Sequence, residues 1–168
     1  MTSRDGRRVA VGAALAQGFT LVELIIVIIL VGARAVFVAP RLLSISDFNV
    51  RGFHDETLGL LRYAQKAAVA QRRTVCVAFS ASGVTLTIAA AAGSLACGVN
   101  LVGPRGDSPG SISGRSGAGY ASVPADFKFD ALGQPRNAGG TVLGAQTIQV
   151  AGAANTITVE GATGYVHD

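Results

Sequence analysis

The sequence is poor in the side chains on which enzymes and metal sites depend. Among its 168 residues there are two histidines, two cysteines and no tryptophan. Cys76 and Cys97 form no CxxC pair and no histidines cluster beside them, so a resident metal is poorly supported. No GxSxG, P-loop or HExxH motif occurs. These absences argue against an enzyme and give no sign of a cofactor.

Two short motifs could suggest an activity, and both have a simpler interpretation. His54-Asp55-Glu56 places acids beside a base. Adjacent residues of a helix point in different directions, so we interpret these three as a solvated helix face. The RGD triplet at Arg105–Asp107 lies in a stretch rich in glycine and proline, and we interpret it as part of a turn rather than as an adhesion motif.

Charge is also scarce, since 14% of the residues are Asp, Glu, Lys or Arg, against about 25% in an average domain. The net charge is +4, and three of the 14 basic side chains but one of the ten acidic ones precede residue 19. The remainder is close to neutral, whereas a nucleic-acid-binding protein usually carries a basic stripe. Nucleic acid is therefore not an indicated partner, although Arg72, Arg73, Arg115 and Arg136 could still converge in space.

What the sequence does contain is one long apolar run. From Phe19 to Val38 only Glu23 and Arg34 are charged, and about 20 residues of helix span the 30 Å hydrocarbon core of a bilayer. Arginines precede the run, so we expect a cytoplasmic N-terminus and a C-terminal part beyond the membrane. A cleaved secretory signal, with VGA at 31–33 as its cleavage site, stays open as an alternative.

Beyond Pro40 the apolar positions become periodic. A spacing of three or four residues relates Val50, Phe53, Thr57, Leu61, Ala64 and Ala68. This spacing predicts an amphipathic helix that continues the first one past a kink at Pro40 and ends near Gln71. SISD at 44–47 is either a local break or part of the polar surface. Gly52 and Gly59 would each weaken the helix by about 1 kcal/mol.

From Thr74 the pattern is that of antiparallel strands. TVCVAFS and VTLTIAA predict a hairpin around Ser82-Gly83, and TIQVAG with NTITVEG predicts a second hairpin. DFKFDA and the closing GYVHD are further strand candidates, while residues 103–124 predict a long loop. The fold class is therefore α+β: a long N-terminal helix, half membrane-spanning and half amphipathic, packed on a small antiparallel β head.

The stretch GFTLVELIIVIIL, which starts at Gly18, resembles the N-terminal signature of type IV pilins and of type II secretion pseudopilins. The resemblance implies that a prepilin peptidase cuts between Gly18 and Phe19 and that Phe19 is then N-methylated. It also implies that Glu23 pairs with the new α-amine of a neighbouring subunit and sets the assembly register. Such a pair would compensate the cost of a carboxylate in hydrocarbon. Pro40 also stands where helices of this class commonly carry a proline.

The resemblance divides the chain into a leader (1–18), a transmembrane and assembly helix (19–40), an amphipathic continuation (41–72) and a periplasmic β head (73–168). The leader is longer than usual, and Arg34 interrupts the usual apolar run. We expect Arg34 to snorkel to the periplasmic interface, with a contact to an acid of a staggered neighbour as the alternative.

The two cysteines belong to the part of the chain that we expect on the oxidising side of the membrane. A disulfide between Cys76 and Cys97 is the natural interpretation there. It would stabilise the head by roughly 3 kcal/mol in the chain-entropy model. Two buried free thiols are the alternative.

Three later segments resemble minor pilins of the GspH/FimT group, and more closely the (MshC-like) minor pilins of MSHA pili. They are FHDE with LRYAQKAAVA (within 51–79), FDALGQPR (within 126–136) and TGYV (163–166). The resemblance implies a non-enzymatic minor pilin that helps prime pilus assembly, with loop 103–124 as a candidate contact surface.

The implied partners are the prepilin peptidase, other major and minor pilins and, before assembly, the inner membrane. The implied location is the inner membrane with a periplasmic head, and then a pilus or pseudopilus. The alternatives are a GspH-like pseudopilin of type II secretion, a FimT-like DNA-uptake pilin, and a bitopic membrane protein that is not cut at Gly18.

Overall fold

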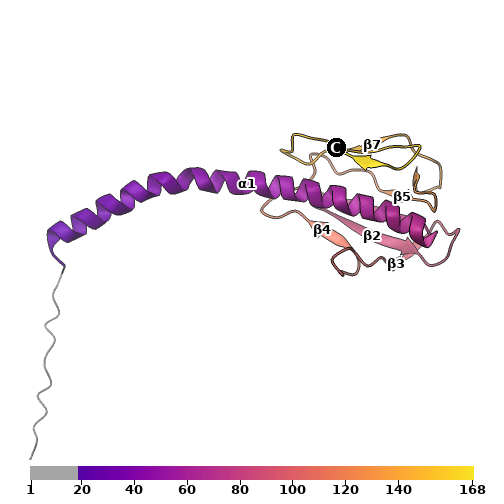
Figure 1. Cartoon of the computed structure of the whole chain (residues 1–168), viewed down its shortest axis with the longest axis horizontal. Helices are drawn as coiled ribbons and strands as arrows, with labels where there is room; N and C mark the ends of the chain where they lie inside the picture. Colours follow the sequence, from indigo (N-terminus) through magenta and orange to yellow (C-terminus); the bar gives the residue numbers. More distant parts are fainter. Residues whose placement is uncertain (1–18) are drawn as a thin grey trace, which may run out of the picture. The chain divides into compact units, whose positions relative to one another are not determined.

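The computed structural model describes residues 19–168, with the side chains of residues 35–45 outside the description. The chain divides into two compact units, Met1–Pro40 and Arg41–Asp168. The leader, including Gly18, lies outside the described residues. The second unit is the head, which contains the C-terminal part of a long helix and the nine strands of the described residues (Figure 1).

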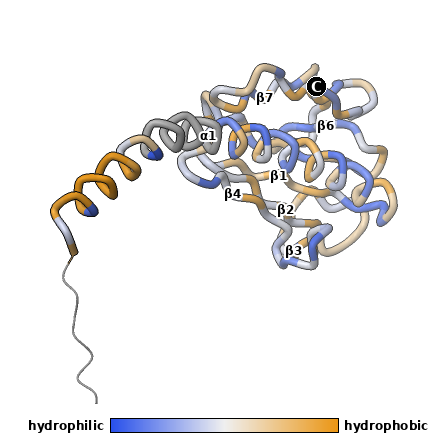
Figure 2. The backbone as a smooth tube through the Cα atoms, turned by 60° about the vertical axis from the view of Figure 1, so that its left-hand side comes forward, coloured by the Kyte–Doolittle hydropathy of each residue, from blue (hydrophilic) through white to orange (hydrophobic). Residues whose placement is uncertain are grey.

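The only helix of the described residues, α1, runs over Leu21–Gln71. Its predicted amphipathic part is confirmed, because Phe53, Thr57, Leu61 and Ala64 are all at most 3% exposed. Polar and apolar segments alternate along this part of the helix in Figure 2. The helix also passes through residues 44–47 without a break. The helix ends where Arg72 adopts a positive φ of 49°, a conformation typical of helix C-termini.

The larger sheet is antiparallel and has the strand order β3-β2-β1-β5-β6, with β4 also paired to β2. Its strands are β1 (Val75–Ser80), β2 (Gly83–Ala89), β3 (Cys97–Asn100), β4 (Ser111–Ser113), β5 (Phe127–Phe129) and β6 (Pro135–Arg136). The smaller sheet has the order β7-β8-β9, with β7 (Gln146–Ile148), β8 (Ile157–Val159) and β9 (Val166–His167).

Both predicted hairpins are present. In the first, Ser80 pairs with Gly83, so the turn consists of residues 81–82 and Gly83 already belongs to β2. In the second, β7 pairs with β8. The prediction of one long loop over 103–124 is wrong, because Ser111–Ser113 forms β4 along β2.

The core of the head lies between the buried face of α1 and the inner faces of the two sheets. Leu61 and Ala64 of the helix are fully buried, as are Val75 of β1, Phe129 of β5 and Ile157 of β8. In Figures 1 and 2, β2 and β4 lie on one side of this part of the helix and β7 on the other. The fold is therefore α+β as predicted, a long helix with an antiparallel β head.

Candidate functional site

The described helix of the N-terminal unit is mostly apolar (Figure 2), and its two charged side chains are Glu23 and Arg34. Its large apolar side chains are between 46% and 83% exposed, and they are Phe19, Leu21, Val22, Leu24, Ile25, Ile26, Val27, Ile28, Ile29, Leu30 and Val31. A helix on the surface of a globular protein buries one apolar stripe and turns polar residues to water. An exposed apolar surface of this extent marks an interaction site.

Among the residues that the structure describes, no helix has both the length and the apolar composition needed to cross a bilayer. The predicted transmembrane segment, 19–40, extends over residues 35–40, whose side chains are outside the description. The membrane anchor therefore stays a prediction.

The first turn of α1 is fixed by Thr20 and Glu23. Thr20 Oγ1 accepts a hydrogen bond from the Glu23 backbone N–H at 3.2 Å, which makes Thr20 the N-cap of the helix. Threonine followed three residues later by glutamate is the sequence of a capping box, and an acid in the first turn also interacts favourably with the helix dipole. This local role was not predicted, although the spacing of threonine and glutamate in TLVE indicates it.

The Glu23 side chain is nevertheless available to a partner. It is exposed, and the ion pairs found within the described part of the chain all involve other residues. Phe19, whose amine the predicted cleavage would free, is 83% exposed. Arg34 is also exposed and follows Glu23 by about 16 Å of helix, too far for a pair within one chain.

Two predicted features of the helix are not visible in the described residues. Gly18, the first half of the cleavage junction, lies outside them. Pro40 lies within α1 as its backbone is assigned, but its side chain is outside the description. Cleavage at Gly18 and the kink at Pro40 therefore stay predictions.

Cys76 and Cys97 are joined in a disulfide, with their Cα atoms 6.1 Å apart. Cys76 lies on β1 opposite Thr87, and Cys97 begins β3 opposite Ala89. The bond therefore connects the two strands on either side of β2. Free thiols, the alternative interpretation, are not found.

The segments that carry the resemblance to minor pilins lie together in the head. From LRYAQ on α1, Gln65 Nε2 donates to the Thr163 carbonyl and Arg62 Nε donates to the Val166 carbonyl, both at 2.9 Å. Thr163 and Val166 are the ends of TGYV. The helix thus holds the C-terminal segment through side-chain donors rather than through apolar packing alone.

The third segment, FDALGQPR, packs against the other two at Gly133. A Cβ on Gly133 would lie 3.0 Å from the Val69 side chain of α1, and a Cβ on Gly164 would lie 1.7 Å from the Gly133 carbonyl oxygen. Both glycines also have positive φ, 83° and 67°. This close approach requires glycine at both positions, so the quoted motifs have a structural role.

Asp130 organises the turn of FDALGQPR between β5 and β6. Its Oδ1 accepts the backbone N–H groups of Leu132 at 2.9 Å and Gln134 at 2.8 Å, and its Oδ2 lies 2.5 Å from Arg136 Nε. Burial by itself would raise the pKa of Asp130. The hydrogen bonds from Arg136 and the two backbone groups outweigh burial and hold that pKa below its usual value.

The RGD triplet is part of a turn, as predicted. Asp107 Oδ2 accepts the Ser111 backbone N–H at 2.6 Å, and this bond is the main reason that the pKa of Asp107 is lowered. Arg105 donates to the Ser111 carbonyl at 3.0 Å and lies 3.6 Å from a Glu56 carboxylate oxygen. The triplet therefore tethers the start of β4 to α1.

The four arginines that could have formed a nucleic-acid surface, Arg72, Arg73, Arg115 and Arg136, do not all lie together, although Arg72 is exposed. Arg73 donates to the Ala89 carbonyl, and Arg136 is bound to Asp130. Arg115 lines a small hollow with Glu56 and other residues of α1 between 48 and 56. From there to the end of the helix at Gln71 the rise is about 22 Å, which separates Arg115 from Arg73.

His54 departs from the prediction of a solvated helix face. It is 5% exposed, and its Nδ1 lies 3.2 Å from Oδ1 of the exposed Asp55. The signal was in the sequence, because His54 follows Val50 by four residues and precedes Thr57 by three. It therefore belongs to the buried face as much as Phe53 does.

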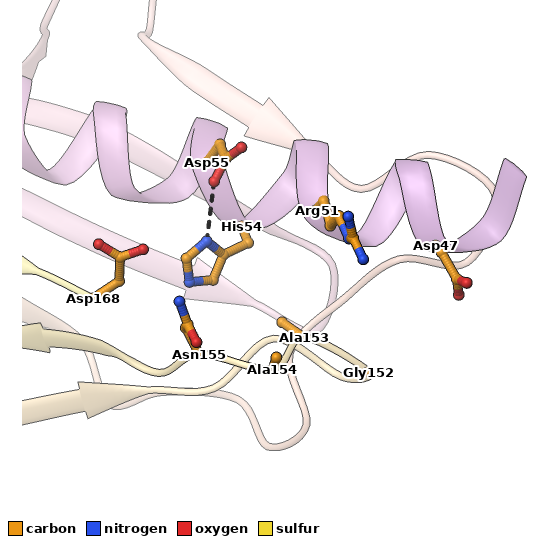
Figure 3. Close-up of a pocket in the computed structure, with 9 residues that line it drawn as sticks. All are labelled: Asp47, Arg51, His54, Asp55, Gly152, Ala153, Ala154, Asn155 and Asp168. Carbon is orange, nitrogen blue, oxygen red and sulfur yellow. Dashed lines mark hydrogen bonds and ion pairs between the residues drawn. The ribbon is translucent and has the colours of Figure 1, made fainter. Parts of the chain in front are cut away.

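His54 lines an open pocket of about 460 Å³ in the head. The other residues around it are Asp47, Arg51, Asp55, Gly152, Ala153, Ala154, Asn155 and Asp168 (Figure 3). Within the described ranges, 19–34 and 46–168, no group of three or more His, Cys, Asp or Glu side chains is placed to hold a metal ion.

Two crystal structures of the type IV minor pilin FimU from Pseudomonas aeruginosa are similar to this chain. They give TM-scores of 0.45 and 0.46 at 16% and 17% sequence identity. The similarity covers 70% of this chain and 90% and 86% of those chains. No protein-family model and no curated protein matches the chain.

Proposed function

We propose that this chain is a non-enzymatic subunit of a type IV pilin-like filament, in which the N-terminal helix is the assembly element. The observation that carries the proposal is the helix itself, which exposes apolar side chains in every direction from Phe19 to Val31. A helix with apolar side chains on all its faces is normally buried in lipid or among other helices. It begins within GFTLVE, the stretch that resembles the pilin cleavage signature.

The proposed pathway starts at the inner membrane. The helix anchors the chain with its head in the periplasm, and a prepilin peptidase cuts between Gly18 and Phe19. Cleavage creates a positively charged amine on Phe19, which is then methylated. Because Thr20 caps the helix and Glu23 is exposed in the first turn, the Glu23 carboxylate can reach the amine of a neighbouring subunit. Such a desolvated pair would discriminate against misregistered neighbours.

Within this class we propose a minor pilin of the MSHA type that helps prime assembly through its head. The support is the set of three segments, LRYAQ, FDALGQPR and TGYV, that contact one another around Gln65, Gly133 and Gly164. The exposed parts of residues 103–124 would be a contact surface for neighbouring heads. A GspH-like pseudopilin of type II secretion would share these features and stays the alternative.

A FimT-like role in DNA uptake has less support from the described residues. Nucleic-acid binding needs several basic groups on one surface. Arg73 and Arg136 are engaged by protein acceptors and Arg115 lies at a different part of α1, which leaves Arg72 as one exposed arginine at the helix end. A DNA gel shift at low salt tests this alternative, and binding that falls steeply with added salt would support it.

The experiment that tests the proposed function is mass spectrometry and N-terminal sequencing of the full chain. The protein is purified from cells that contain a prepilin peptidase and from matched cells with an inactive one. We expect a chain that starts at methylated Phe19 in the first cells and an intact leader in the second. An intact leader in both would contradict the proposal and leave a bitopic membrane protein with a periplasmic β domain.

A further inference from the structure

His54 is a buried side chain, and one of its two ring nitrogens has no hydrogen-bond partner among the described residues. Its Nδ1 lies 3.2 Å from Asp55 Oδ1, and because an ionised carboxylate only accepts, Nδ1 carries the hydrogen and donates. In the neutral imidazole Nε2 is then an acceptor. Among the described residues this buried Nε2 has no hydrogen-bond partner. A buried acceptor without a partner is unfavourable and therefore needs an explanation.

The imidazole forms one wall of the open pocket in Figure 3. Asp47, Arg51 and Asp55 line the helix side, and Asp168 and the 152–155 loop between β7 and β8 line the other side. Three carboxylates against one guanidinium make the pocket acidic. In Figure 3 the exposed side chain of Asn155 lies next to the imidazole, so it is the group that an entering ligand would displace.

The ligand that complements these groups is a cation with several hydrogen-bond donors. The lone pair of Nε2 and the carboxylate oxygens only accept, and guanidinium and ammonium groups only donate. A metal ion fits less well, since the described residues hold no cluster of three ligating side chains. We propose that the His54 pocket binds an arginine or lysine side chain of a neighbouring subunit. The identity of this occupant as a subunit rests on the proposed function, because heads of neighbouring subunits meet in a filament.

The first test measures binding of a soluble arginine derivative to the full chain in detergent micelles. The chain has two histidines, so isotope labelling of histidine nitrogens gives few NMR resonances. In the variant His167→Gln the remaining resonances belong to His54, which assigns them. N-acetylarginine amide is titrated at mildly alkaline pH, where ordinary imidazole is neutral. We expect the Nε2 resonance of His54 to shift saturably, and N-acetylcitrulline amide, which is neutral and nearly isosteric, to shift it little.

A carboxylate variant with a matched control completes the test. Asp168→Asn removes one charge from the pocket, and we expect it to weaken arginine binding about twofold to fivefold, the range of exposed ion pairs. Glu160→Gln removes a carboxylate that pairs with His167 at 3.0 Å outside the pocket, and it should leave the affinity unchanged.

Several results would overturn the inference. They are no shift with the arginine derivative, an equal shift with citrulline, an unchanged affinity in Asp168→Asn, and a response of His54 to zinc ions alone, which would indicate a metal site. These measurements use the unassembled chain and do not depend on leader cleavage. If the His54 pocket does not bind arginine, the proposed assembly function is unaffected. If the leader is not cleaved, the binding result still holds, but the occupant can no longer be assigned to a neighbouring subunit.

Discussion

At the scale of single residues, Asp130 links several parts of one turn. Its carboxylate accepts from two backbone groups and from Arg136, and Arg136 in turn donates to the Gly140 carbonyl at 2.8 Å. The lowered pKa of Asp130 means that the folded head favours its ionised form more than the unfolded chain does. Linkage then requires that this stabilisation be present above the unfolded pKa and be lost as the pH falls through the lower, folded pKa.

We therefore expect Asp130→Asn to lower the free energy of unfolding by about 1–3 kcal/mol at neutral pH, since it weakens a charge-assisted hydrogen bond. The difference from the wild type should shrink as the pH falls below about 4, where the wild-type carboxyl also becomes protonated. Urea unfolding of the full chain in micelles, followed by circular dichroism at neutral and acid pH, measures both effects.

Asp47→Asn is the matched control for this prediction. Asp47 is exposed, so its substitution should change the stability by less than about 0.5 kcal/mol. A difference between Asp130→Asn and the wild type that stayed constant from neutral to acid pH would contradict the assignment of this stabilisation to the Asp130 charge.

At the scale of elements, two glycines show that the same substitution by alanine has opposite effects in a helix and in a turn. Gly59 lies on the exposed face of α1, with nothing within 4 Å of an added Cβ. Alanine therefore fits there, and it also reduces the conformational entropy of the unfolded chain. Gly133 has a φ of 83°, and a Cβ added to it would lie 3.0 Å from the Val69 side chain of the same helix. Alanine there meets both a left-handed backbone and a close neighbour.

We expect Gly59→Ala to stabilise the head by about 0.5–1 kcal/mol and Gly133→Ala to destabilise it by about 1–2 kcal/mol. The midpoints of thermal unfolding of the two variants, measured side by side with the wild type, test the prediction. Shifts of the same sign would show that the backbone conformations described for α1 and for the β5–β6 turn are not what limits stability.

The elements that could be predicted from the sequence are those with a local pattern. The spacing from Phe53 to Ala68 predicted the buried helix face, and β-branched runs predicted both hairpins. The short strands β3, β4 and β6 were not predicted, because their residues do not belong to a longer β-branched or alternating run. They are strands because β2 and β5 offer them partners, nearby in the sequence for β3 and β6 and distant for β4, in which Ile112 pairs with Val84.

The candidate site also contains residues that could be predicted from a local motif and residues that could not. Phe19 and Glu23 were predicted from a motif, and the structure adds that Thr20 caps their helix. The His54 pocket was not predicted, since it combines α1 with the 152–155 loop and Asp168, about a hundred residues later. Only the tertiary fold brings these groups together, whereas the burial of His54 itself was readable from its helix spacing.

At the scale of the whole molecule, the two units differ in whether their apolar side chains are buried within the unit. The head buries its own core, including Leu61, Phe129 and Ile157. The described helix of the first unit leaves its large apolar side chains from Leu21 to Val31 exposed. In the proposed filament these side chains do not need residues of the head to bury them. Other copies of the same helix would remove that surface from water, and Glu23 is the one acid within it.

This arrangement predicts that Glu23 acts in assembly and not in folding or cleavage. In Glu23→Ala the Thr20 cap keeps its hydrogen bond, because the donor is the Glu23 backbone N–H, and the head lies in the other unit. The Phe19 amine of a neighbour would instead be buried without its partner, which should reduce incorporation into filaments about tenfold or more. Quantitative immunoblotting of sheared filaments against whole cells measures incorporation, and the mass of the cellular chain reports cleavage.

Glu160→Ala, which removes a carboxylate from the head, should assemble normally. Normal incorporation of Glu23→Ala would remove the assembly role, and a loss of cleavage would move that role to recognition by the peptidase.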